Sequence, residues 1–319
     1  MVCPKCGSEN VKANGKHRNG SQRFKCRDCK KTFTENRPRL LGDMRLPVEK
    51  AVDILRLLVD GMSIRACERF TGVCHKTICD MILEVGERCR DFMAERLQGI
   101  PVADVQVDEV WSFVGQKEKT KIIKKEYDPM TGDSYAYIAL ERNSKLIVSY
   151  LLGKRDEFDT KEFASKLRLA TAGRFQLSTD GWHPYRTAMP SEMGDRIDFS
   201  QIIKSFESLP RHKWEGKYSP AEIVKIDKKP VCGNPDPAYI CTSHVERSNL
   251  TLRMTVRRWT RLTNAFSKSW RHHEAALCIY LAFYNFCRSH MTLKTTPAVA
   301  ARLTDHVWTM EELLAATAA

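Results

Sequence analysis

The fold prediction starts from SHVERSNLTLRMTVRRWTR, residues 243–261. At 100° per residue, its side chains fall on two neighbouring stripes. The apolar stripe is Val245, Leu252, Val256 and Trp259, and the charged stripe is Glu246, Arg253, Arg257 and Arg261. Because no Pro or Gly interrupts the run, we predict one helix over the whole stretch. The apolar stripe would pack on a core, while a carboxylate suits a divalent metal ion and a row of guanidinium groups suits phosphates. The alternative is a solvated helix face with ion pairs within the helix.

The bulk composition limits the classes of protein to consider. The 319 residues are 42% hydrophobic, which is enough for two or three domains with real cores. The formal net charge of +13 points to a polyanionic partner. A polar start, MVCPKCGSEN, and the lack of an apolar run of about 18–20 residues argue against a signal peptide and a membrane span. We therefore expect a cytoplasmic protein, in which the twelve Cys do not form a disulfide framework.

Residues 1–39 carry a metal-site pattern. Two C-x2-C pairs, separated by nineteen residues, are formed by Cys3, Cys6, Cys26 and Cys29. This paired spacing is typical of a structural zinc ion held by four thiolates, so we predict a zinc ribbon. The segment also holds eleven Lys and Arg against three acidic residues, a balance of +8. A ribbon that touches the DNA backbone is the favoured interpretation, and a ribbon that docks on protein is the alternative.

Residues 40–98 predict three helices in a helix-turn-helix arrangement. The run 47–59 has helical periodicity, Ser63 can cap a second short helix, and Thr71-Gly72 supplies a turn. A third, long amphipathic helix begins near His75, and we expect its far end to dimerise. In the DNA-reading version, the exposed start of this helix faces bases or phosphates through His75, Lys76 and Thr77. The alternative is an ordinary three-helix packing unit.

Residues 102–319 have the element order of an α/β catalytic domain. Strand-like runs at 102–114, 135–140 and 146–151 precede a helix at 163–172, a strand at 174–179 that leads into Asp180, and later the Glu246 helix. This is the order of a ribonuclease-H-like fold, here with a helical C-terminal tail. Residues 207–242 contain five Pro and are predicted to be an insertion with a small β excursion. The apolar run 275–286 is predicted to be a buried helix.

Three carboxylates can meet in such a domain. Neighbouring strands would bring Asp108 and Asp180 side by side, and the helix carrying Glu246 would cross their ends. Three hard oxygen ligands suit one or two Mg²⁺ ions, which can activate a water or a 3′-hydroxyl for attack at phosphorus. We predict that Glu109, the neighbour of Asp108, points to the other face of the strand and lies outside the site.

Six short motifs, taken together, resemble the insertion-sequence-1 family of transposases over roughly residues 1–270. They are CPKC at 3–6, CRDC at 26–29, DEVWSFVG at 108–115, TDGW at 179–182, HVERSNLTLR at 244–253 and FSKS at 266–269. Some members join their DNA-binding and catalytic parts by a translational frameshift, whereas this chain carries both in one frame.

The resemblance implies a DDE-type transposase that binds the terminal inverted repeats of its element, cleaves there and joins the ends to target DNA. Its catalytic triad would be Asp108, Asp180 and Glu246, and the ribbon and helix-turn-helix would recognise the ends. We further expect Arg253 and Arg257 to contact phosphates, and we expect a homo-oligomer on double-stranded DNA, because joining two ends requires at least two protomers. The alternatives are a zinc-ribbon helix-turn-helix regulator with an inactive catalytic domain and a nuclease that cuts without joining.

Three other residues have more than one interpretation. Asn249, one turn after Glu246, could contact a phosphate or a metal-bound water, or only solvent. His244 could support a metal ligand. Trp182 could stack on an unpaired base, although a core aromatic is the favoured interpretation.

Overall fold

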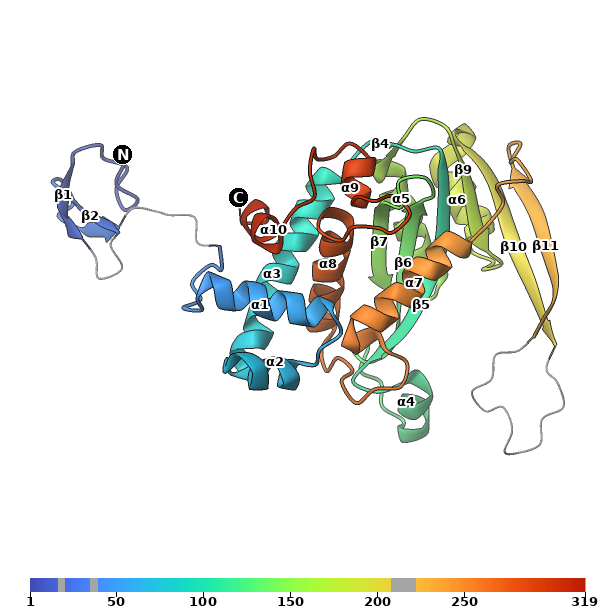
Figure 1. Ribbon diagram of the computed structural model, residues 1–319, viewed down its shortest axis with the longest axis horizontal. Helices are drawn as coiled ribbons and strands as arrows, with labels where there is room; N and C mark the ends of the chain where they lie inside the picture. The colour runs from blue at the N-terminus through green and yellow to red at the C-terminus, as the bar shows by residue number, and fades with distance from the viewer. Residues whose placement is uncertain (17–20, 35–39, 208–221, 319) are drawn as a thin grey trace.

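The computed structural model describes residues 1–16, 21–34, 40–207 and 222–318 (Figure 1). The N-terminal part is a small antiparallel sheet in the order β1-β2-β3. Its strands are β1 (Val11–Lys16), β2 (Gln22–Cys26) and β3 (Thr32–Thr34). The turn after Cys3 closes with the amide of Gly7 donating to the Cys3 carbonyl at 2.9 Å, and Gly7 takes a φ of +71° that favours glycine. The four-Cys ribbon predicted for this segment is confirmed.

The three helices predicted after the ribbon are present. They are α1 (Val48–Val59), α2 (Ile64–Thr71) and α3 (His75–Arg96). The Ser63 hydroxyl accepts from the Ala66 amide at 3.2 Å, and Gly72 ends α2 in the left-handed conformation, as its position after Thr71 suggests.

The far end of α3 packs against the C-terminal part of its own chain. Phe92 lies edge-to-face with Phe286 at 5.2 Å between ring centroids and 5.8 Å from Trp308. Along the same contact, Gly86 touches Ala275 so closely that a Cβ at Gly86 would come within 2.5 Å of the Ala275 Cβ. The apolar residues at this end that suggested a dimer contact pack on helix α8 (Trp270–Phe286), so they do not support dimerisation, which stays a prediction.

The main sheet has six strands in the order β11-β10-β9-β5-β6-β7. Strands β5, β6 and β7 form an antiparallel meander, whereas β9 runs parallel to both β5 and β10, and β11 is the antiparallel edge. The bounds are β5 (Asp104–Val114), β6 (Gly132–Glu141), β7 (Ile147–Gly153), β9 (Phe175–Asp180), β10 (Ile197–Glu207) and β11 (Glu222–Cys232). Two short strands, β4 (Ile100–Pro101) and β8 (Thr171–Ala172), pair in parallel beside it.

Helices cover both faces of the sheet (Figure 1). On one face lie α5 (Glu157–Ala170) and α6 (Tyr185–Met193), the second followed by the short turn η1 (Gly194–Arg196). On the other face α7 (Ser243–Thr255) crosses β5 and β6, with α8 beside it. The remaining elements are α4 (Glu118–Lys124), η2 (Arg257–Trp259), α9 (Pro297–Ala300) and α10 (Met310–Ala316). A mixed α/β sheet with helices is thus confirmed.

The helix predicted over 243–261 is shorter than expected. It ends at Thr255, Val256 is extended, and η2 follows. The hydroxyls of Thr251 and Thr255 donate to the carbonyls four residues earlier, a bond that competes with regular helix continuation. Val256 and Trp259 are nevertheless buried, at 6% and 1% exposure, so the apolar stripe packs on the core through the turn.

The predicted insertion begins as an extension of the sheet. Strands β10 and β11 form a long hairpin that projects beyond the other strands in Figure 1. The predicted β excursion is therefore present in part, while residues 208–221 lie outside the described residues. None of the helices in the described ranges combines the length and the apolar character needed to cross a membrane.

Candidate functional site

The sheet register brings two of the predicted carboxylates together. Strand β5 pairs in parallel with β9, with Val107 opposite Thr179, so Asp108 and Asp180 occupy the next position on each strand. The carboxylate oxygens of Asp108, Glu109 and Asp180 lie within 4.8 Å of one another. The prediction that Asp108 and Asp180 meet on neighbouring strands matches this geometry.

Helix α7 is fixed onto β5 by two polar contacts. The side-chain carbonyl of Gln106, which is fully buried, accepts from the backbone amides of His244 and Val245 at 3.0 and 3.3 Å. One turn on, the Asn249 amide donates to the Asp108 carboxylate at 2.8 Å. Gln106 satisfies orphan donors at the first turn of the helix, and Asn249 is a direct partner of a predicted metal ligand. Asn249 is therefore neither a solvent-facing residue nor free in this state.

The carboxylates are held in an environment that disfavours their charge. Burial, together with the carboxylates of Asp180 and Glu246, raises the pKa of Asp108 to about 6, against the lowering effect of the Asn249 hydrogen bond. Burial also raises the pKa of Asp180, against the opposing effects of the Trp182 amide and the neighbouring cations. Because Glu246 raises the pKa of both aspartates, its charge acts on the same site although it comes from α7.

Glu109 lies closer to this site than predicted. Its carboxylate accepts a hydrogen bond from the Tyr185 hydroxyl on α6 and pairs with Arg155 at 3.1 Å. The contact with α6 agrees with the predicted orientation toward the other face. However, β9 ends at Asp180 while β5 continues to Val114, so the sheet is open beside Glu109 and its carboxylate reaches the site. The prediction that Glu109 lies apart from Asp108 and Asp180 was therefore wrong, while its omission from the metal ligands stays a prediction.

The third predicted carboxylate stands slightly apart. Glu246 accepts from the Thr242 hydroxyl at 2.8 Å and forms an ion pair with Lys204 on β10. Among the described residues, the group of acidic side chains within 4.8 Å contains Asp108, Glu109 and Asp180 but not Glu246. The helix nevertheless presents Glu246 to the same end of the sheet.

The donor set suits a hard divalent cation. The groups are carboxylates, which Mg²⁺ prefers, and their raised pKa values reflect burial and mutual repulsion that a cation would relieve. Glu109 is less suited as a ligand, because its side chain is only 3% exposed and both oxygens have protein partners. The residues that fit are Asp108 and Asp180, with Glu246 from the helix.

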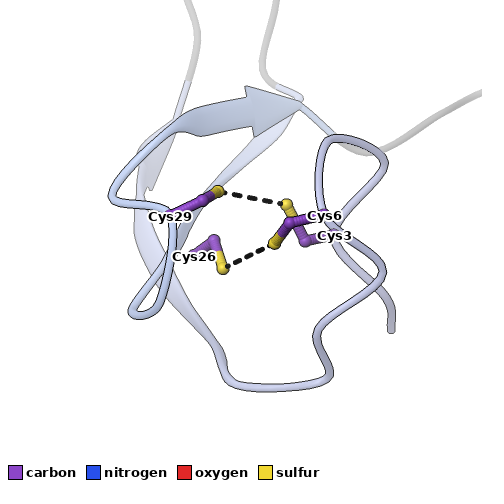
Figure 2. A group of neighbouring side chains, drawn as sticks. All are labelled: Cys3, Cys6, Cys26 and Cys29. Atoms are coloured by element: carbon purple, nitrogen blue, oxygen red, sulfur yellow. Dashed lines mark hydrogen bonds between the residues drawn. The ribbon is translucent and has the colours of Figure 1, made fainter.

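The four cysteines form a second candidate metal centre (Figure 2). The Sγ atoms of Cys3 and Cys29 lie 3.7 Å apart, as do those of Cys6 and Cys26. A tetrahedral zinc ion with Zn–S distances of about 2.3 Å separates its sulfurs by about 3.8 Å, so the spacing fits zinc. A hydrogen bond from the Cys29 amide lowers the pKa of the Cys26 thiol to about 7, whereas the pKa of Cys6 is raised, because hydrogen bonds with the other thiols outweigh the one with the Ser8 amide. The spacing of the four sulfurs is therefore the observation that fits zinc.

The predicted DNA-reading residues lie at the start of α3, but they differ in what they contact. His75 Nδ1 lies 2.9 Å from a Glu68 carboxylate oxygen and 3.0 Å from Arg65, and the His75 amide also donates to Glu68. His75 thus ties α3 to α2, and this hydrogen bonding lowers the pKa of Glu68 to about 2. Lys76 is exposed and Thr77 is half-buried. DNA contact by these three residues stays a prediction.

The predicted phosphate-binding arginines no longer share one helix face. Arg253 is on α7 and partly buried, and burial lowers its pKa. Arg257 is exposed in η2, beyond the end of the helix.

His244 lies 3.2 Å from the Lys145 ammonium rather than beside a carboxylate, and Trp182 donates to the Thr160 hydroxyl at 3.1 Å. Trp182 is therefore packed into the protein, as favoured.

Three residues of the site carried no recognisable signal in the sequence. Arg155 follows β7, Lys204 lies on β10 and Tyr185 begins α6, so they meet the carboxylates only through the sheet order. Gln106 did carry a signal, because a polar residue at an inward position of a buried strand usually has a specific partner.

Comparisons with known proteins agree with these observations. Residues 1–30 match the family model described as the InsA N-terminal domain, a zinc ribbon. The chain is 23% identical to the insertion element iso-IS1n protein InsB of Shigella dysenteriae over 181 residues, which are 57% of this chain and 95% of the relative. The structure of the piggyBac transposase synaptic complex with hairpin DNA aligns at 10% identity over 86% of this chain and 71% of that chain, with a TM-score of 0.37, too low to establish a shared fold. The first two matches confirm the resemblance to the insertion-sequence-1 family of transposases that the sequence motifs indicate.

Proposed function

We propose that the protein is a DDE transposase that cleaves DNA at the ends of its element and joins those ends to target DNA with Mg²⁺. The observation that carries the proposal is the juxtaposition of Asp108 and Asp180 by the β5/β9 register, with α7 held across β5 by Gln106 and Asn249. The similarity to an InsB protein supports the same reaction class.

The element order supports a ribonuclease-H-like catalytic domain. A three-strand meander is followed by α5, then by β9 ending in Asp180, and later by α7 with Glu246. This is the order predicted from the sequence. The capped helix α2, the glycine turn and α3 likewise support a helix-turn-helix that binds the terminal inverted repeats, with Lys76 exposed at the start of α3.

The residues of the site have two roles, metal ligand and residue that orients a ligand. Asp108, Asp180 and Glu246 would hold Mg²⁺, which when bound activates the attacking hydroxyl and stabilises the leaving oxygen of an in-line displacement. Asn249 orients Asp108, and the Trp182 amide orients Asp180 at 3.0 Å. Because the attacking groups are water and a 3′-hydroxyl, no Ser or Tyr nucleophile is required.

The partners follow from the chemistry and the charge. The balance of +13 suits a DNA duplex, and the ribbon adds eight of those charges next to the predicted DNA-reading helices. Joining two ends requires two active sites in concert, so the working form is a homo-oligomer on DNA.

The decisive experiment uses purified protein and labelled DNA from both flanks of its gene. Wild type and Glu246→Gln are incubated with Mg²⁺, and nicked and joined products are separated by electrophoresis. We expect metal-dependent cleavage at a defined repeat and joined products from wild type only. Specific, zinc-dependent binding without cleavage would identify a regulator instead, and cleavage without joining would identify a nuclease.

A further inference from the structure

Two of the predicted metal ligands are already paired with the protein's own cations. Arg155 Nη2 lies 3.0 Å from Asp180 Oδ2, and the Lys204 ammonium pairs with Glu246 Oε1. The cations come from separate elements on the two sides of the site, Arg155 from the segment after β7 and Lys204 from β10.

We propose that Arg155 and Lys204 are resident counter-ions, which release Asp180 and Glu246 when a divalent metal ion binds and then bind phosphates of the DNA strand at the site. This inference rests on the proposed function, because it assumes that these carboxylates hold the metal. Its consequence is that metal binding and DNA binding reinforce each other.

Arg155 has contacts other than Asp180 that hold it at the site. Its guanidinium lies 4.4 Å from the centre of the Trp182 ring and 3.1 Å from the Glu109 carboxylate. Glu109 is in turn fixed by the Tyr185 hydroxyl. Loss of the Asp180 contact therefore leaves two supports that keep the guanidinium in place.

The present position of Arg155 also leaves one of its donors unused. Its Nε is buried and has no hydrogen-bond partner among the described residues. Its side chain is 33% exposed, so an incoming strand can reach it. Because Nε is buried, the exposed nitrogens of the guanidinium are the ones that an incoming phosphate can reach, and Nε gains a partner only if the side chain shifts.

Lys204, unlike Arg155, is not held in place by additional contacts that the structure describes. It is a flexible, point-like cation, 27% exposed, and it lies two residues beyond Ile202, which pairs with Asp180 across the sheet. Among the described residues, its recorded partner is Glu246. Once Glu246 turns to a metal ion, the ammonium group is free to swing toward a phosphate without moving the strand.

The charge balance favours this exchange. With Glu109 included, the four carboxylates carry four negative charges, and Arg155 and Lys204 leave a balance of −2. A divalent ion on Asp108, Asp180 and Glu246 would leave Lys204 without its carboxylate and Arg155 with Glu109 alone. A DNA phosphate can then pair with Lys204 and with the donors that Arg155 withdraws from Asp180, so each ligand increases affinity for the other by the same factor.

The test uses zinc-loaded, full-length protein with Arg155→Gln, Lys204→Gln and the double substitution. Mn²⁺ binding is measured by electron paramagnetic resonance without DNA. Binding of a labelled duplex from the flanking DNA is measured by fluorescence anisotropy, with and without Ca²⁺. Matched controls are Arg174→Gln and Lys225→Gln, which remove a cation from the ion pairs with Asp198 and Asp227.

Because a competing cation is removed, each single variant should bind Mn²⁺ about two- to fivefold more tightly than wild type, the range expected for one partly exposed ion pair. The controls should not change, and Arg155→Lys, which keeps the charge, should stay close to wild type. Ca²⁺ should increase the DNA affinity of wild type, and this increase should be lost in the double variant.

The outcomes separate the two proposals. Equal Mn²⁺ binding by wild type and Glu246→Gln would overturn the proposed function together with this inference. Glu246-dependent Mn²⁺ binding that the Arg155 and Lys204 variants leave unchanged or weaken would overturn the counter-ion role alone. Tighter Mn²⁺ binding with an intact Ca²⁺ effect on DNA would overturn the transfer of the cations to phosphate. Circular dichroism of each variant confirms that it is folded.

Discussion

Replacing the buried carboxylate Asp108 by an amide should stabilise the protein in the absence of Mg²⁺. Asn keeps the shape of the side chain and the oxygen that accepts from Asn249, but it removes a charge from a buried site that already contains Asp180. In the folded protein, burial raises the pKa of Asp108 from 3.8 to about 6. The unfolded chain therefore ionises at lower pH than the folded one.

The size and sign of the effect follow from this shift. For a carboxyl group with a raised folded pKa, stability is fully present below the unfolded pKa of 3.8 and is lost as the pH rises through about 6. At 1.36 kcal/mol per pKa unit, the loss is about 1.6 kcal/mol at pH 5 and about 3 kcal/mol at pH 7. Asp108→Asn removes this loss, so its advantage over wild type should grow by about 1.4 kcal/mol between the two pH values.

Urea unfolding of zinc-loaded protein without Mg²⁺, followed by far-UV circular dichroism at both pH values, measures the difference. The control is Asp198→Asn, the same chemical change at a carboxylate whose pKa the Arg174 ion pair lowers to about 2. That variant should be less stable than wild type, by about 1 kcal/mol, because Arg174 is 58% exposed and solvent weakens the pair, although Asp198 is 20% exposed. An Asp108→Asn protein no more stable than wild type at pH 7 would refute the reasoning.

Three further predictions concern the parts of the fold that support the site. Gly86→Ala should lower the free energy of unfolding by about 1–3 kcal/mol in urea, because the new Cβ would come within 2.6 Å of the Ala275 backbone, and the gain in helix propensity of about 1 kcal/mol does not offset this. Cys26→Ser should reduce bound zinc from one ion per chain to none by elemental analysis, and should expose the ribbon to limited proteolysis. Burial lowers the pKa of His273 to about 3, so the protein should lose stability as the pH falls below about 6.5, and the thermal midpoint of His273→Phe should depend less on pH over that range.

Local patterns in the sequence predicted the parts of the fold whose physics is local. The paired Cys spacing identified the ribbon, because each C-x2-C pair places two thiolates on one side of an ion. The Ser63 cap predicted the first residue of α2, and the Thr71-Gly72 turn predicted its end to within one residue, because Thr71 is still helical. Where two local effects competed, the prediction failed: the helical period of 243–261 continued past Thr255, but the threonine hydroxyls and Val256 ended the helix.

The long helix α3 shows why an apolar stripe does not identify its partner. The apolar residues at its far end suggested contact with a second protomer, which stays a prediction, and they pack on α8, nearly two hundred residues away in sequence. Helical periodicity predicts that one face of a helix is buried, but it does not identify the element that covers that face. The contact depends on Gly86, whose missing side chain allows the two helices to approach.

In the candidate site, too, some contacts could be predicted from local patterns and others depend on the tertiary structure. Asp108 and Asp180 could be paired in advance because one strand order puts them at neighbouring positions. By contrast, the contacts of Glu109, Arg155 and Lys204 depend on where β9 stops and on how far side chains reach around its end. These three residues decide how the site holds charge when no metal ion is bound. Burial and repulsion raise the pKa of Asp108, and the cations offset only part of that cost. In the proposed function, a metal ion would bring the positive charge that the buried carboxylates lack, and a DNA strand would bring negative charge to Arg155 and Lys204.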